Sequence, residues 1–447
     1  MTASVRTPPG VVFWFRSDLR LHDQPALAQA AALARERGGW LLPVFVHDAR
    51  LQAPTRWGFT RMGTQRRAWR AMALQALTQA LEALGSTLVQ IEGDPVDLLG
   101  GLLARLHQPL LVCEDIPAPE EEAQVRALRA RGLRVQTVWQ STLLAPEALP
   151  FGPQAVPDHF TAFRQRLQAH GVRAAPPLAA VSALPDLPPE AGLRACAEAL
   201  PRTGEAPSRQ APRVDGRAAF PWDRPEYHGG ERAALRHLAA YCERQLPHRY
   251  KATRNGLVGT DFSSKWSPWL ATGALSARTA WAAIEAFERA HGASDSSYWL
   301  FFELLWRDHF RWLHRKHGVR LYHAQGLGTL PAPSHDAQAF ERWCRGETGE
   351  AFIDAGMREL AASGYLSNRM RQNVASFLIH ELGGDWRAGA AWFEARLIDY
   401  DVCSNQGNWL YLSGRGTDPR GQRRFNPRLQ AQQYDPDGAY RRLWSSA

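Results

Sequence analysis

Short apolar runs alternate with Ala/Leu/Arg-rich stretches through the first 140 residues, and this alternation leaves few folds open to the chain. The runs are four to six residues long and rich in β-branched or aromatic residues, which is typical of strands. Strands that are apolar throughout are buried on both faces, so helices must cover both sides of a parallel sheet. We therefore predict an N-terminal Rossmann-like α/β domain over 1–145. Its strands are expected at 11–15, 41–46, 87–91, 110–113 and 135–139, with helices at 25–37 and 66–84.

Proline marks the next change, because 14 of the 30 prolines lie between residues 146 and 225. Such a segment is a poor helix or central strand, and we predict a Pro-rich interdomain linker there. From 226 to 447 the periodicity is helical, which predicts an all-α C-terminal domain. Its clearest helices are expected at 228–246, at 277–290, from an Asp295 or Ser cap to Gly318, from a Ser367-Asn368 cap to Gly383, and at 385–399.

The chain has no run of about 18 apolar residues and no apolar N-terminal stretch that would mark a secretory signal. Its cysteines are odd in number, scattered and without a CxxC pair, which argues against a disulfide framework or a zinc knuckle. They are Cys113, Cys196, Cys242, Cys344 and Cys403. We expect a reduced cytoplasmic protein that contacts no membrane, and we expect a monomer.

Net charge is +9, from 53 basic and 44 acidic residues, which favours a polyanion such as nucleic acid as the partner, although many Arg-rich proteins are merely soluble. The 17 tryptophans suit stacking on flat rings or electron transfer, although core packing accounts for most of them. The motifs GxGxxG, GxxxxGK[ST], HExxH and GxSxG are absent. His309, His314 and His317 share a predicted helix, but their spacing does not form a metal-facing stripe, so no metal site is predicted.

The segment 299–317 places Glu303, Trp306, Arg307 and Phe310 on one helical face. The neighbouring residues are almost all apolar, so a Glu303–Arg307 pair is expected to be partly buried beside aromatic rings. That face suits a flat heteroaromatic ligand. The alternative is a surface pair one turn apart, which would contribute only a few tenths of a kcal/mol.

Two further segments carry anion-binding residue types. Asn368, Arg371 and Gln372 lie at the start of a helix, where exposed N–H groups favour an anion, although capping alone would explain the Asn. The segment 260–270 combines hydroxyls, backbone N–H groups and a cation ahead of a helix near Pro268, the composition of a diphosphate cradle. A Ser-rich turn is the alternative there.

A predicted helix runs into Asp399 and Asp401 and breaks at 405–407. Carboxylates at a helix C-terminus oppose the helix dipole, which suggests a local task such as accepting hydrogen bonds from a sugar or a ring N–H. A DxD metal site is a weaker alternative, because no third oxygen ligand lies nearby.

Together these segments resemble the cryptochrome/photolyase family, and within it the DASH branch. The resemblance covers nearly the whole chain in ordered motifs: WFRSDLRLHD at 14–23, TRNGLVGTDFSSKWSPWLATG at 253–273, ELLWRDHFR at 303–311, DAGMRELAASGYLSNRMRQNVASF at 354–377, DYDVCSNQGNW at 399–409 and QAQQYDPDG at 430–438. It implies a U-shaped FAD buried in the helical domain, which makes that domain an FAD-binding catalytic domain.

The resemblance also implies roles for individual residues. Those expected to hold FAD are Tyr250, Ser263, Ser264, Lys265, Trp266, Ser267, Glu303, Arg307, Asn368, Arg371, Asp399, Asp401 and Asn405, the last at the flavin N5. Arg371 is expected to lie near Asp399. Those expected to act at the reacting site are Glu303, Trp306, Gln372, Asn405 and Tyr411. The arginines expected to meet DNA phosphates are Arg254, Arg369, Arg423 and Arg424.

The implied function is light-dependent repair of cyclobutane pyrimidine dimers in DNA by an electron from excited reduced FAD. Many double-strand photolyases have Met and Trp where this chain has Gln372 and Tyr411, so single-stranded DNA is the expected substrate. The alternative is a blue-light signalling photoreceptor on the same fold, although the chain ends soon after the family core, which favours the enzyme. A DxD metal-dependent transferase is a distant third.

The resemblance further implies an electron-transfer chain through Trp409 and Trp386, but Pro-rich residues 330–333 stand where a distal Trp is usual. Trp343 or a tyrosine is expected to provide a detour. A folate antenna (methenyltetrahydrofolate) is expected in a cleft between the domains, with the acidic residues 120–122 as a loose match.

Overall fold

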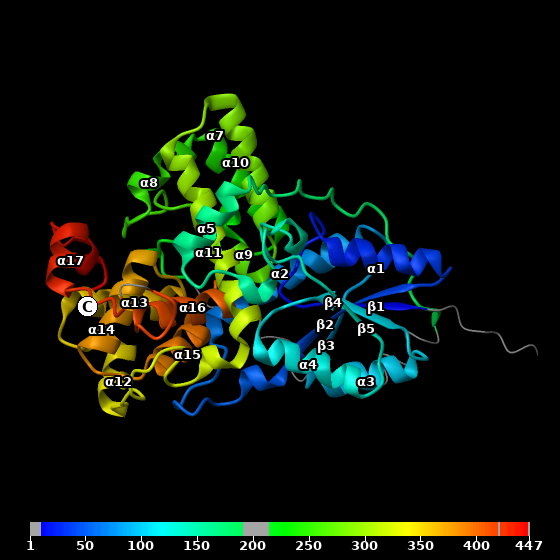
Figure 1. The fold of residues 1–447 in the computed structure, drawn as a ribbon, viewed down its shortest axis with the longest axis horizontal. Helices are drawn as coiled ribbons and strands as arrows, with labels where there is room; N and C mark the ends of the chain where they lie inside the picture. The colour runs from blue at the N-terminus through cyan, green and yellow to red at the C-terminus, as the bar shows by residue number, and fades with distance from the viewer. Residues whose placement is uncertain (1–9, 191–213, 419–420, 446–447) are drawn as a thin grey trace, which may run out of the picture.

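The computed structural model describes residues 10–190, 214–418 and 421–445, which form an α/β domain followed by a helical domain (Figure 1). The α/β domain is built on a five-stranded parallel sheet with strand order β3-β2-β1-β4-β5. The strands are β1 Val11–Phe15, β2 Leu41–Asp48, β3 Val89–Gly93, β4 Leu110–Glu114 and β5 Val135–Val138. The predicted fold class is confirmed.

Helices cover both faces of the sheet, which explains why the strands are apolar throughout. Alternate residues such as Val11 and Phe13 pack under α1 (Pro25–Glu36) and α2 (Thr64–Glu82). The intervening ones, such as Val12, pack on α3 (Pro95–Arg105) and α4 (Pro119–Ala130). Figure 1 shows α1 on one side of the strands and α3 and α4 on the other.

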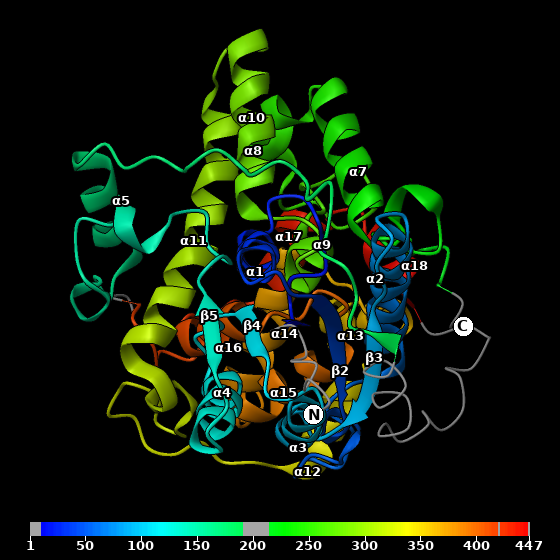
Figure 2. The same cartoon turned by 90° about the vertical axis from the view of Figure 1, so that its right-hand side faces the viewer.

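The segment predicted as a linker contains a helix. α5 (Phe160–Ala169) packs its apolar side on the helical domain, and Figure 2 shows it beside α11. Phe160, Phe163 and Leu167 are spaced for a helical face, a signal that the surrounding prolines hide in the sequence. The domain boundaries at 145 and 225 stay predictions.

The helical domain contains shorter helices around one long helix, α11. The described helices are α7 Glu231–Glu243, α8 Tyr250–Thr253, α9 Ser267–Thr272, α10 Ala277–His291, α11 Asp295–His317, α12 Ala337–Arg345, α13 Ala351–Ser363, α14 Asn368–His380, α15 Trp386–Arg396, α16 Val402–Leu412, α17 Pro427–Tyr434 and α18 Ala439–Leu443. The cap of α11 is Ser294, which forms a capping box with Ser297, rather than Asp295 or a following serine.

The prediction for 397–409 was wrong. α15 ends at Arg396, and α16 starts after Asp401 and continues through Gly407 without a break. Asp401 is the N-cap of α16 and accepts a hydrogen bond from the Ser404 amide at 2.7 Å. Gly407 is needed inside the helix because the Phe310 ring lies where its Cβ would stand, at 2.1 Å. The Asp therefore lies at a helix N-terminus, where a carboxylate is favourable.

The polar residues of the opening motif join the two domains. The Asp23 carboxylate is fully buried and accepts hydrogen bonds from Ser276 Oγ at 2.5 Å and Arg278 Nη2 at 2.6 Å, at the start of α10. Arg20 donates to the Gly273 carbonyl at 3.0 Å, and Glu231 of α7 accepts from the amides of residues 21 and 22. We call the five side chains in these contacts, Arg20, Asp23, Glu231, Ser276 and Arg278, the interdomain lock.

Within the described residues, no helix is both long and apolar enough to cross a bilayer. The described cysteines, Cys113, Cys242, Cys344 and Cys403, are free thiols, and Cys196 lies outside the described residues. No three His, Cys, Asp or Glu side chains of the described ranges gather as a metal site. His309 and His314 are buried and hydrogen-bonded to the carbonyls of Pro157 and Phe310.

Asp23→Asn is expected to lower the free energy of unfolding by about 3–5 kcal/mol, because the substitution leaves Arg278 buried without its counter-charge. Urea titration of the first unfolding transition measures the loss. The control is Glu341→Gln, which breaks an exposed pair with Arg345 and should cost less than about 1 kcal/mol. Equal losses in both variants would contradict the role of the lock.

Candidate functional site

A cavity of about 790 Å³ opens in the helical domain. Its walls come from α5, α8, the loop before α9, α11, the start of α14, α16 and the segment 417–423. We call it the helical-domain cavity. The predicted site residues that line it are Tyr250, Arg254, Ser263, Ser264, Lys265, Trp266, Ser267, Glu303, Trp306, Arg307, Asn368, Arg371, Gln372, Tyr411 and Arg423. The structure thus gathers them from six separate segments, and their individual roles stay predictions.

The loop before α9 has the shape expected of an anion cradle. Ser263 and Lys265 both adopt left-handed backbone angles, with φ near 59° and 60°. The Lys265 side chain is 2% exposed, and its Nζ lies 3.2 Å from the centre of the Phe262 ring, without a hydrogen-bond partner among the described residues. Burial lowers the pKa of Lys265 well below its usual value. An anion in the cavity would raise this pKa again, because it favours the charged ammonium.

Other buried polar atoms along the cavity also lack partners among the described residues, namely Gln372 Oε1 and Trp266 Nε1. A buried polar atom without a partner costs about 1–3 kcal/mol, so a bound polar molecule would stabilise this wall. The buried amine of Lys265 in the cradle, with an amide and an indole N–H along the wall, fits a dinucleotide that carries a diphosphate. The residues present therefore fit FAD.

The start of α14 carries Asn368 and Arg371 into the same cavity. Ser367 is the N-cap and accepts from the Met370 amide, so capping does not account for Asn368. Arg371 Nη2 donates to Asp399 Oδ2 at 2.7 Å. Burial alone would lower the pKa of Arg371, but the Asp399 carboxylate outweighs it and the net shift is upward. This pair keeps a cation fixed at the cavity wall.

The two acids of the DYD motif do not line the helical-domain cavity. Asp399 lies behind Arg371, and Asp401 forms an ion pair with Arg311. Burial would raise the pKa of Asp401, but Arg311 and Arg307 hold it well below its usual range. In this structure both carboxylates pair with arginines. The resemblance implied that Arg371 lies near Asp399, whereas the pairing of Asp401 with Arg311 and its cap on α16 were not predicted.

The expected Glu303–Arg307 pair is not formed. Glu303 pairs with Arg254 of α8, whose guanidinium also lies over the Trp299 ring at 4.7 Å. Arg307 instead donates to the carbonyls of Ser141 and Leu270, and burial lowers its pKa to about 10. The sequence missed this because the better-placed cation is 49 residues away in the chain.

Aromatic side chains form another wall of the cavity. The rings of Trp306 and Tyr411 meet edge to face, with centroids 5.5 Å apart. Arg423 donates to the Tyr411 hydroxyl and pairs with Asp418 at 2.5 Å. Phe160 of α5 stacks on Trp306. Sequence reasoning overlooked Phe160 and Asp418, and only the helical spacing within 160–167 could have pointed to Phe160.

The remaining arginines expected to meet DNA have protein partners in this structure. Arg369 donates to Asn255 Oδ1 at 3.0 Å and lies over the Tyr434 ring. Arg424 forms an exposed pair with Glu381 at 2.9 Å. Neither lines the cavity.

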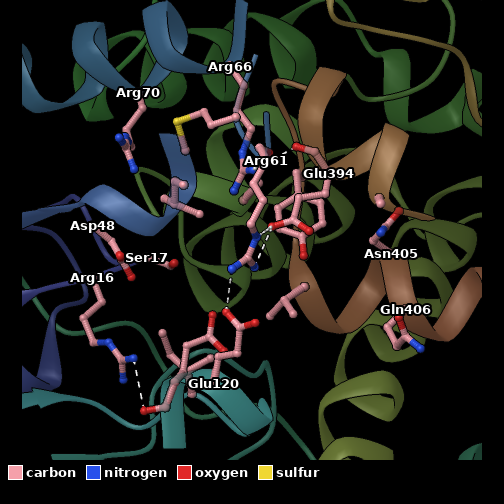
Figure 3. A pocket seen from close by; sticks show the side chains of 18 of the residues that line it. Arg16, Ser17, Asp48, Arg61, Arg66, Arg70, Glu120, Glu394, Asn405 and Gln406 are labelled. Carbon is pink, nitrogen blue, oxygen red and sulfur yellow. Dashed lines mark hydrogen bonds and ion pairs between the residues drawn. The ribbon is translucent and has the colours of Figure 1, made fainter. Parts of the chain in front are cut away.

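A second cavity, of about 720 Å³, lies between the domains at the carboxyl ends of β1 and β2, and we call it the interdomain cavity (Figure 3). Arg61 reaches across it to Glu120 and Glu394, both at 3.0 Å. Burial and neighbouring arginines lower the pKa of Arg70 to about 10. Carboxyl ends of parallel strands are where open α/β sheets bind ligands.

Asn405 lines the interdomain cavity instead of the helical-domain cavity. It donates to the Ala390 carbonyl at 3.0 Å, and Figure 3 shows it across the space from Arg16. The residues beside it on α16, such as Ser404 and Asn408, line the helical-domain cavity. α16 therefore separates the two cavities, with Asn405 on the interdomain side.

Trp386 and Trp409 are both buried and close in the fold. Trp386 lines the interdomain cavity and donates to the Ala324 carbonyl at 3.1 Å. The Trp409 ring packs against α15 at Gly389, where a Cβ would stand 2.2 Å from it, one turn after Trp386. Phe393 contacts Trp409 with centroids 5.1 Å apart.

Lys265→Met is expected to weaken FAD binding by about ten- to a hundredfold, because a charge-assisted hydrogen bond contributes about 1.5–3 kcal/mol. The same variant should stabilise the protein stripped of FAD. Burial disfavours the protonated Lys265 only in the folded protein, so the cost is present at neutral pH and falls as the pH rises towards about 10.4.

Fluorimetric FAD titration and thermal unfolding from pH 7 to 10 measure both effects. Lys251→Met, an exposed Lys outside the cavity, is the control and should change neither. A variant that lost stability without FAD and bound FAD normally would show that Lys265 has a structural role only.

Sequence models of two families match the chain: DNA photolyase over residues 11–182 and FAD binding domain of DNA photolyase over residues 299–446. The cryptochrome DASH of Gloeobacter violaceus is 40% identical over 445 residues, which cover 97% of this chain and 85% of that protein. The Synechocystis sp. PCC6803 cryptochrome structure superposes with a TM-score of 0.86 at 38% identity, covering 98% of this chain and 89% of that one.

A class III photolyase from Agrobacterium tumefaciens superposes with a TM-score of 0.76 at 28% identity, over 99% of this chain and 88% of that one. The matches extend over both domains, so they include the sheet, the cradle and the aromatic wall. The chain, which carries an FAD-binding domain, belongs to the cryptochrome/photolyase family and is similar to its cryptochrome DASH branch.

Proposed function

We propose that this protein uses light to split cyclobutane pyrimidine dimers in DNA, with single-stranded DNA preferred. The observation that carries the proposal is the helical-domain cavity, which combines an anion cradle at Lys265 with an aromatic wall at Trp306 and Tyr411. A cofactor with a diphosphate and a substrate with flat rings fit into one space. Membership of the family and the net charge of +9 support DNA as the partner.

Reduced FAD, when bound and excited by light, would supply the electron that splits the dimer. The residues of this chain would hold and orient the cofactor and the substrate. Lys265 and the serines of the cradle would bind the diphosphate, and Arg371, fixed by Asp399, would hold a positive charge beside it. Burial raises the pKa of Glu303, while Arg254 beside it favours the carboxylate, and this carboxyl group would form a hydrogen bond with a base.

Four arginines would bring the DNA to the cavity: Arg254, Arg369, Arg423 and Arg424. Each has a side-chain partner in this structure and would exchange or share it for a phosphate. Affinity should therefore fall steeply with salt, with a slope of about 0.7 per phosphate for a single strand. A single-stranded dimer is cheaper to bring into the cavity, because no base pair has to be broken.

We propose a folate antenna for the interdomain cavity. Its support is the position of the cavity at the sheet edge and the presence of Glu120, whose carboxylate pairs with Arg61 there. Burial raises the pKa of Glu121 beside it, and this carboxyl group would hydrogen-bond to the polar edge of a ring.

The proposed electron supply runs through Trp409 and Trp386. Trp343 offers the detour, since it stacks 6.5 Å from Phe393, which in turn contacts Trp409. Trp343 is itself fully buried, and Phe340 continues the row of rings from it to Trp57. The aromatic row therefore leads towards the half-buried Trp57 instead of to residues 330–333.

Illumination of the reduced protein with a thymine-dimer oligonucleotide is the test of function. We expect repair of the single strand to exceed repair of the duplex. Trp306→Ala should weaken binding of the dimer about tenfold, since base stacking contributes about 1–3 kcal/mol, and should keep FAD. Trp281→Ala, on α10 outside the helical-domain cavity, is the control. An intact dimer after illumination of the wild type would favour the signalling photoreceptor.

Trp409→Phe is expected to abolish light-driven reduction of the bound oxidised FAD, because a buried donor is lost, while chemically prereduced protein still repairs dimers. Trp343→Phe should slow the photoreduction. Transient absorption of the two variants and the wild type measures the rates. Undiminished photoreduction in Trp409→Phe would contradict the inner step, and an unchanged rate in Trp343→Phe would contradict the detour.

A further inference from the structure

Phe160 stacks face to face on Trp306, with ring centroids 3.8 Å apart and planes inclined by 10°. Phe160 comes from α5, within the Pro-rich segment between the domains, whereas Trp306 is on α11. Phe160 is buried and Trp306 is half-buried at the cavity wall. One face of the indole is therefore covered by a ring from a different part of the chain.

The start of α5 is tied to α11 by polar contacts just before Phe160. His309 Nε2 is hydrogen-bonded to the Pro157 carbonyl at 2.8 Å. Lys316 donates to Asp158 Oδ1 at 2.8 Å, and His317 Nε2 lies 2.7 Å from the same oxygen. Burial lowers the pKa of His309 to about 4, so its ring is neutral at physiological pH and its hydrogen bond does not depend on titration there.

The remainder of α5 is tied to α11 as well. Gln168 and Arg164 both donate to the Tyr298 hydroxyl, at 2.9 and 3.3 Å. Between the two sets of contacts, the Phe160 ring meets the Phe302 ring of α11 edge to face, with centroids 5.0 Å apart. A helix held at both ends and in the middle keeps Phe160 in place, so the ring is a fixed backing for Trp306 and not an occupant that leaves.

We propose that Phe160 is a positioning residue that holds the Trp306 indole in the orientation that receives a base, which makes α5 part of the substrate wall. That Trp306 receives a base rests on the proposed function. The physical reason is that an indole on a long helix has two rotatable side-chain torsions, and a stacked ring on one face with Tyr411 at an edge leaves a single packed orientation. Trp306 also lines the helical-domain cavity, where a base would stack on it.

Phe160→Leu keeps an apolar side chain of similar volume and removes the flat ring. Phe160→Tyr keeps the ring and should behave as the wild type. Phe163→Leu is the matched control, since Phe163 is equally buried on the same helix and has no ring contact with Trp306 among the described residues. FAD content after purification reports whether each variant folds.

The first readout does not involve DNA. Protein labelled with 5-fluorotryptophan gives a ¹⁹F resonance for Trp306, assigned with Trp306→Phe. We expect this resonance to shift and broaden in Phe160→Leu and to stay unchanged in Phe163→Leu and Phe160→Tyr. An unchanged Trp306 resonance in Phe160→Leu overturns the proposal, whatever the protein does to DNA.

The second readout is the ratio of affinities for a thymine-dimer single strand and the undamaged strand. Phe160→Leu should lower this ratio about fivefold, whereas Phe163→Leu should keep it near the wild-type value. FAD content should be maintained in both variants. A higher ratio in Phe160→Leu would show that Phe160 occupies the base site, and would overturn the proposal. A wild type that does not discriminate between the strands would refute the proposed function, while the ¹⁹F result would still decide the role of Phe160.

Discussion

The buried carboxylate of Asp23 lies between the two domains and fixes the position of the helical domain relative to the sheet. Asp23 has no exposed surface, and it is satisfied by two side chains at the start of α10. Arg20 donates a further hydrogen bond to the Gly273 carbonyl at the end of α9. Gly273 has a left-handed backbone conformation and lies so close to Ser17 that a Cβ on Gly273 would stand 2.0 Å from the Ser17 carbonyl oxygen. Because the cradle directly precedes α9, the lock fixes the cradle relative to the sheet.

Ion pairs inside the helical domain are arranged so that most acids serve arginines. Asp399 holds Arg371, Asp401 holds Arg311, and burial makes each pair costly to break from one side. Lys265 is the contrast, because its amine is buried and has no hydrogen-bond partner among the described residues. Paired charges thus form the frame, and the unpartnered amine of Lys265 marks the place for an anion.

The aromatic wall is assembled from three distant parts of the chain. Trp306 comes from α11, Tyr411 from α16 and Phe160 from the segment between the domains. Tyr411 is oriented by Arg423, and Trp306 by the ring stacked on it. A flat substrate would therefore meet side chains whose orientations are already fixed, so little conformational entropy is lost on binding.

The sequence by itself determined the layered α/β domain, the helical domain and the segments that carry chemistry. Strands that are buried on both faces and helices with one apolar face each have a characteristic hydrophobic pattern, and a short stretch of sequence is enough to recognise it. The motifs also determined the family, since their order and composition extend over nearly the whole chain. This local pattern does not determine which distant residue a side chain contacts.

Tertiary structure decided those partners. Glu303 pairs with Arg254, 49 residues away in the chain, instead of with Arg307 one helical turn along. Folding brings the Arg254 guanidinium, which lies over the Trp299 ring, next to the Glu303 carboxylate. Asp401 is the N-cap of α16, Asn405 lines the interdomain cavity, and Phe160 of α5 stacks on Trp306. In each case the energy comes from desolvated charges and stacked rings brought together by folding, and such contacts depend on distances across the fold that sequence spacing does not encode.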